Sequence, residues 1–146
     1  MAAAILTPLH DKLRPIAETM VPPIADLDDA AFLKVLALID VRLAGEPPAL
    51  GRQLRLFVKV LTFLPIFFAL RTFGGLAPKR RLAFLEALQD CPIQKLRVGV
   101  WGLRTLIYLG YYTDPEVQAA LGYRPRLDGW EGLAREKAQQ AHEVHP

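Results

Sequence analysis

The chain has 146 residues, of which 52% are hydrophobic and 23% are charged, so it has the size and composition of one folded domain and is not intrinsically disordered. The net charge of +3 is too small to indicate a polyanionic partner by itself. A single cysteine excludes an internal disulfide, and the three histidines lie near the two ends of the chain, too sparsely for a histidine-built metal site.

The N-terminal segment is expected to be helical from Thr7-Pro8 onward. A hydroxyl residue followed by proline is typical of a helix start, with Thr7 as the N-cap and Pro8 in the first turn. This helix would end before Pro22, and Pro15 inside it predicts a kink or an early break. The segment lacks a basic start, a continuous apolar run and a twin-arginine pair, so we expect no signal peptide and a cytoplasmic protein.

Three aspartates precede the next predicted helix. Carboxylates stabilise a helix N-terminus, which explains Asp26, Asp28 and Asp29 without any catalytic role. Apolar residues then recur at helical spacing up to Gly45. This face comprises Phe32, Val35, Leu36, Ile39 and Leu43.

Residues Leu50–Gly75 are the most apolar part of the chain. Their longest uncharged run is too short to cross a bilayer, which needs about 20 apolar residues. Pro65 divides the segment, so we expect one helix to about Phe63 and a second through Phe73.

A basic helix is predicted to begin at Pro78, with three leucines inward and four charged residues outward. The leucines are Leu82, Leu85 and Leu88; the charged residues are Lys79, Arg80, Arg81 and Glu86. From Arg71 to Arg104 the chain carries seven positive and two negative residues. Nucleic-acid-binding proteins combine such charge with exposed stacking aromatics, whereas the aromatics here alternate with core residues, so we favour a solvated basic face and no nucleic-acid partner.

The stretch Cys91–Tyr123 is predicted to form a long helix, a break and a short helix. Pro92 suits the first turn, and aliphatic residues follow at steps of three and four: Ile93, Leu96, Val100, Leu103 and Ile107. Gly99 and Gly102 would allow another backbone to approach closely. Asp114 and Pro115 are expected to restart the chain as a helix that Gly122 ends.

A second stripe on the long helix combines arginine with aromatic residues: Arg97, Trp101, Arg104, Tyr108 and Tyr111. It is either a wide core face or a protein interface, since Trp, Tyr and Arg dominate interface energetics. The same half of the chain holds Tyr112, Tyr123 and Trp130. We take all eight residues as candidate partner contacts.

No catalytic group stands out. Cys91 has no histidine nearby to activate its thiol, and Gly74-Gly75 lacks the spaced glycine, lysine and serine of a phosphate-binding loop. We therefore expect no catalytic, cofactor-binding or metal-binding residue in this chain.

The fold class predicted from these elements is all-α. Residues 1–123 would form a compact bundle of about six helices, and residues 124–146 a peripheral, partly helical tail that begins with an extended Arg124-Pro125-Arg126 and a capping-box pattern at Asp128.

The pattern LAPKRRLAFLEAL followed by PIQKLRVGVWGLRTLIYLGYYTDPEVQAALGY resembles the small (gamma) subunit family of flavin-dependent gluconate 2-dehydrogenase, the subunit 3-like family. The similarity covers most of residues 63–123. Its most specific parts are the helix around Arg81, the run Leu-Ile-Tyr-Leu-Gly-Tyr-Tyr, and Asp114-Pro115-Glu116-Val117 leading to Tyr123.

The resemblance implies a non-catalytic subunit that binds and stabilises a large glucose–methanol–choline-type oxidoreductase. That partner would carry FAD and oxidise an alcohol, sugar or sterol. Many members are exported on a twin-arginine signal. This chain departs from that pattern, so we expect it to form such a complex in the cytoplasm. The alternative is a peripheral membrane-binding helical protein that uses Phe57–Phe73 and the adjacent Lys79, Arg80 and Arg81.

Overall fold

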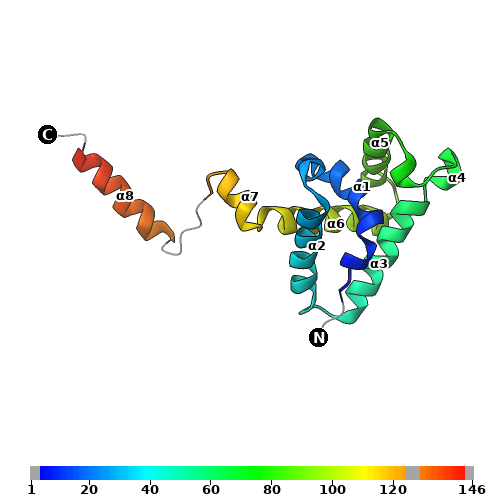
Figure 1. Ribbon diagram of the computed structural model, residues 1–146, viewed down its shortest axis with the longest axis horizontal. Helices are drawn as coiled ribbons and strands as arrows, with labels where there is room; N and C mark the ends of the chain where they lie inside the picture. The colour runs from blue at the N-terminus through cyan, green and yellow to red at the C-terminus, as the bar shows by residue number, and fades with distance from the viewer. Residues whose placement is uncertain (1–3, 124–128, 144–146) are drawn as a thin grey trace. The chain divides into compact units, whose positions relative to one another are not determined.

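The computed structural model describes residues 4–123 and 129–143, and within these residues it is α-helical without a β-strand. The predicted all-α class is confirmed. The chain divides into two compact units, Met1–Asp114 and Pro115–Pro146 (Figure 1). The first unit therefore ends before the short helix that the sequence analysis grouped with it.

The first unit opens with the 3-10 turn η1 (Thr7–Leu9), followed by α1 (His10–Met20), η2 (Pro22–Asp26) and α2 (Asp29–Leu43). Pro15 lies inside α1 without ending it. The prediction that Thr7 caps this helix is wrong, because Leu6 precedes η1 and makes no side-chain capping bond.

Thr7 instead binds the Asp40 carboxylate of α2. Asp40 accepts hydrogen bonds from the backbone N–H groups of Ile5 (3.0 Å), Leu6 (2.8 Å) and Thr7 (3.1 Å). The Thr7 hydroxyl donates a fourth, at 2.7 Å. A single carboxylate therefore satisfies the free N–H groups at the start of the first helical segment.

The aspartates before α2 act as the helix-start interpretation predicts. Asp28 is the N-cap of α2, and its Oδ1 accepts a hydrogen bond from the Ala31 N–H at 2.7 Å. Asp29 pairs with Arg14 at 2.9 Å, and the same guanidinium lies 5.3 Å from the centroid of the Phe32 ring. These contacts join α1 to the start of α2.

The apolar middle of the chain forms α3 (Pro48–Phe63), α4 (Ile66–Ala69) and the 3-10 turn η3 (Phe73–Gly75). The first helix ends where predicted, but the expected second helix through Phe73 is wrong. After four residues, Leu70 adopts a left-handed conformation (φ 53°), which a continuing helix cannot accommodate. No helix in the described part of the chain is both long enough and apolar enough to cross a membrane.

The basic helix is α5 (Pro78–Gln89). Leu85 and Leu88 are buried as predicted, but Leu82 is exposed and Phe84 takes the inward position. Arg81 is not a free outward charge either: its Nε donates to the Leu76 carbonyl at 2.9 Å, and its Nη2 to the Gly74 carbonyl. Arg81 therefore fixes the loop before α5 to its first turn.

The long helix, α6 (Gln94–Tyr112), packs against α2 and α5 within the first unit (Figure 1). The close backbone approach occurs at Gly110, where an added Cβ would lie 3.0 Å from the Val35 carbonyl oxygen and 2.6 Å from the Ile39 side chain. The predicted sites of backbone approach are wrong: Gly99 faces the ring of Phe57, and Gly102 has no atom within 4 Å of its Cβ position.

In the second unit, α7 (Pro115–Ala120) is followed by a turn at Leu121 and Gly122, and Gly122 stops the helix as predicted. Gly122 has φ +68°, its N–H donates to Ala119, and the Tyr123 N–H donates to Gln118. This pair of bonds is the Schellman arrangement, which needs a left-handed residue and so favours glycine. The helical part of the tail is α8 (Gly129–Glu143). Residues 124–126 and Asp128, for which an extended segment and a capping box were predicted, lie outside the described residues.

Candidate docking surface

The α6 helix buries one face and presents the opposite face to solvent. Val100, Leu103, Ile107 and Gly110 are buried. The predicted aliphatic face is therefore confirmed at Val100, Leu103 and Ile107. Leu96 is only half-buried against the core, and Ile93 is exposed because the helix begins at Gln94 rather than at Pro92.

The N-terminal half of the predicted Arg/aromatic stripe points outward. Arg97, Trp101 and Arg104 are exposed, and 70% of the Trp101 surface remains accessible. A tryptophan usually buries most of its large apolar surface, so this degree of exposure distinguishes Trp101 from the core aromatics. At these three positions the stripe is a surface and not part of the core.

The C-terminal half of the stripe is partly buried. Tyr108 and Tyr111 are half-buried and pack against the core, whereas Tyr112 is exposed. Tyr108 and Tyr111 are therefore partly core residues, as the wide-core alternative predicts. The other residues of the stripe lie on the surface, as the interface alternative predicts. Burial raises the pKa of the Tyr111 phenol, and the neighbouring Tyr112 and the Asp26 carboxylate raise it further.

An arginine and three tyrosines form a connected row along α6. The Arg104 guanidinium lies 5.5 Å from the Tyr108 ring centroid, and its Nη2 is 3.5 Å from the Tyr108 hydroxyl. Tyr108 stacks on Tyr112 with centroids 5.7 Å apart and rings within 8° of parallel. Tyr112 meets the edge of Tyr111 at 4.9 Å. Rings held by their neighbours lose little rotamer freedom when a partner binds.

Sequence analysis missed two members of this surface, Val98 and Leu109. Val98 is 59% exposed, and Leu109 is also exposed. Together with Trp101, Thr105 and Tyr112 they lie at helical spacing on the side of α6 opposite its buried residues. That spacing could have identified them, because Val98 and Leu109 fall outside the predicted core stripe. We call Val98, Trp101, Thr105, Leu109 and Tyr112 the outer face of α6.

The outer face carries no charge, and the two arginines lie along one side of it. Arg104 is the only charged residue between Val98 and Tyr112. An uncharged centre containing Trp and Tyr and bordered by arginine has the composition of the core and rim of a protein interface.

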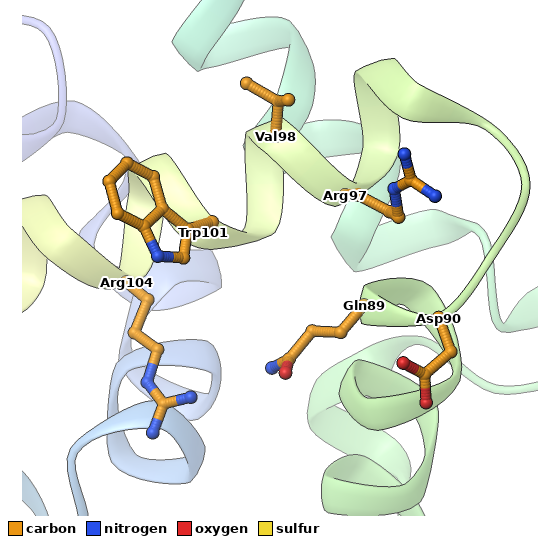
Figure 2. A pocket seen from close by; sticks show the side chains of 6 residues that line it. All are labelled: Gln89, Asp90, Arg97, Val98, Trp101 and Arg104. Atoms are coloured by element: carbon orange, nitrogen blue, oxygen red, sulfur yellow. The ribbon is translucent and has the colours of Figure 1, made fainter.

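Beside the N-terminal half of the outer face lies an open pocket of about 400 Å³. Gln89 and Asp90 at the end of α5 form one wall, and Arg97, Trp101 and Arg104 of α6 form the other (Figure 2). Within the described residues, the Arg97 side chain makes no hydrogen bond or ion pair, although its backbone N–H donates to the Ile93 carbonyl. The pocket thus offers an apolar ring, an unpaired guanidinium and a carboxylate to side chains of a partner.

The two remaining predicted contacts, Tyr123 and Trp130, belong to the second unit. Both are exposed there. The structure therefore brings together six of the eight candidates on α6 and places these two in a separate unit.

The described residues contain no group of three or more His, Cys, Asp or Glu side chains arranged to hold a metal. The Cys91 thiol is half-buried, and its Sγ lies 3.5 Å from the Ile93 carbonyl oxygen.

No protein-family model matches the chain, and no curated protein or solved structure is significantly similar to it.

Proposed function

We propose that this chain is a non-catalytic helical subunit that binds and stabilises a larger protein through the outer face of α6. The observation that carries the proposal is the 70% exposure of Trp101 on a helix whose opposite side is the centre of the core. The opposite face of α6 is packed into the core, so the helix presents Trp101 outward, and aromatic and arginine side chains contribute most to interface affinity.

The row from Arg104 to Tyr112 supports the same proposal. Its rings are already packed on one another, so a partner would cover them without first ordering them. Arg97 and Arg104 along one side would select a partner surface with acidic groups, mainly by accelerating association.

The sequence resemblance gives the class of the partner: a flavin-dependent alcohol, sugar or sterol dehydrogenase or oxidase of the glucose–methanol–choline type. FAD would belong to that partner and not to this chain. In this proposal Tyr123 and Trp130 in the second unit provide additional contacts with the same partner.

Co-expression of the chain with a glucose–methanol–choline-type flavoprotein encoded by a neighbouring gene would test the proposal. We expect the two proteins to elute together in size-exclusion chromatography, with flavin absorbance in the shared peak. A flavoprotein that is equally soluble, equally stable and separate in the presence of this chain would contradict the proposal.

A further inference from the structure

A second exposed apolar surface lies at the end of α3 and in the α4 segment that follows it. Phe67 and Leu70 are 87% and 88% exposed, and Phe68 is exposed although its ring contacts Phe84 of α5 at 5.7 Å. Other exposed apolar side chains precede them. They are Leu56, Phe63 and Ile66. We call residues 63–70 the apolar tip; it lies beside α5 at the edge of the first unit (Figure 1).

The backbone holds the tip in an outward conformation. Pro65 is buried and interrupts the helix after Phe63, and α4 then lasts for only four residues. Leu70 adopts φ 53°, a left-handed conformation that is unfavourable for a side chain with a Cβ and that glycine or asparagine usually occupies. An exposed leucine in that conformation stabilises neither the core nor the turn, so its side chain is better explained by a contact outside the chain.

Cations flank the apolar tip in the sequence, and no carboxylate lies within it. Between Glu46 and Glu86 the chain has seven arginines and lysines and no aspartate or glutamate. Lys59 lies one helical turn before Phe63, Arg71 follows Leu70, and Arg80 lines an apolar hollow that Phe68 also lines. Lys59, Arg71 and Arg80 are all exposed.

We propose that the apolar tip binds the surface of an anionic lipid bilayer. Exposed phenylalanine and leucine would enter the boundary between headgroups and acyl chains, while Lys59, Arg71 and Arg80 would meet the lipid phosphates. Charge complementarity favours this occupant, because Lys59, Arg71 and Arg80 are exposed and no acidic residue lies between Glu46 and Glu86, and such a segment suits a uniformly negative surface better than the mixed charge of a typical protein. The four-residue α4 is far too short to span a bilayer, so the tip would lie on the membrane.

This proposal is independent of the proposed function. The apolar tip shares no residue with the outer face of α6, so either surface can fail its test without affecting the other.

Flotation of the full-length chain with vesicles tests the proposal. One set of vesicles is phosphatidylcholine alone, and the other is phosphatidylcholine and phosphatidylglycerol in equal parts. We expect binding to the anionic vesicles, weaker binding to the neutral ones, and release as the salt concentration rises. No binding to the anionic vesicles, or equal binding to both sets, would overturn the proposal.

Two variants test whether the apolar tip is the part of the chain that binds the vesicles. Phe67→Ala should weaken it about tenfold or more, because a buried phenylalanine contributes that much to transfer from water. Leu70→Gly should also weaken it while leaving the melting temperature unchanged or higher, since glycine tolerates φ 53°. The matched control is Trp101→Ala, which removes an exposed aromatic residue elsewhere and should bind vesicles like the native chain.

Native-like binding by Phe67→Ala and Leu70→Gly would overturn the proposal. So would sedimentation equilibrium showing that the chain forms a dimer that Phe67→Ala dissociates, because the apolar tip would then be an interface between two copies of the chain.

Discussion

The guanidinium of Arg104 lies 5.5 Å from the ring centroid of Tyr108, one turn further along α6. This contact connects the charged side of the docking surface to its stacked tyrosines. Arg104→Lys keeps the positive charge but loses the planar group that lies over the ring, so it should weaken partner binding about three- to tenfold. Titration calorimetry with the partner measures the loss. The control is Arg71→Lys, at a residue remote in sequence and outside this surface. An equal decrease in partner affinity in this control variant would contradict a local role of Arg104.

Asp40 is predicted to stabilise the fold through the four hydrogen bonds that its carboxylate accepts. Asp40→Ala leaves three backbone N–H groups and the Thr7 hydroxyl without their acceptor, which should lower the free energy of unfolding by about 3 kcal/mol. Thr7→Val removes only the hydroxyl bond and should cost about 1 kcal/mol. Urea unfolding measures both changes in the free energy of unfolding. Equal decreases in the two variants would contradict the claim that the Asp40 carboxylate stabilises the three backbone N–H groups as well as the Thr7 hydroxyl.

Two glycines of α6 should respond to alanine in opposite ways. Gly110→Ala places a methyl group 3.0 Å from the Val35 carbonyl oxygen and should destabilise the protein by about 1–3 kcal/mol. Gly102→Ala meets no atom within 4 Å and should stabilise it by about 0.5–1 kcal/mol through better helix propensity. Thermal unfolding of the pair tests the packing of α6 on α2. A stabilising Gly110→Ala would show that the two helices lie further apart.

The raised pKa of Tyr111 predicts a specific loss of stability at alkaline pH. Burial disfavours the phenolate in the folded state, and Tyr112 and Asp26 add to this effect, so the folded protein keeps the proton at a pH where the unfolded chain has released it. The stabilising contribution is complete below the unfolded pKa of about 10 and is lost as pH rises from there through the folded value. Native protein should therefore lose stability relative to Tyr111→Phe above about pH 10. A constant difference between the two melting temperatures from pH 8 upward would contradict the assignment.

The local parts of the fold were predictable from the sequence, and the parts that depend on distant contacts were not. Apolar spacing identified the buried face of α6, and the aspartate before α2 identified its cap. The Asp40 contacts to residues 5–7 were not predictable, because they connect positions more than 30 residues apart. Nor was the left-handed Leu70, since sequence patterns favour glycine or asparagine for that conformation.

The candidate site was predictable in outline. The stripe from Arg97 to Tyr111 was identified by residue type, but its residues differ in solvent exposure. Trp101 is exposed, whereas Tyr108 and Tyr111 are half-buried against the core. Val98 and Leu109 were missed because aliphatic residues on a helix are first assigned to a core. Their helical spacing places them on the side of α6 opposite Val100, Leu103 and Ile107, and this signal in the sequence would have separated them from the core.

The most direct test of the proposed docking surface, the outer face of α6, is the affinity of the purified chain for the separately purified flavoprotein proposed as its partner. The native chain should form a saturable complex, and Trp101→Ala should weaken it about 30-fold or more, as expected for an interface anchor. Phe67→Ala, which changes a still more exposed aromatic residue in the apolar tip, should bind like the native chain. Native affinity in the Trp101→Ala variant, or no complex with the native chain, would contradict the account.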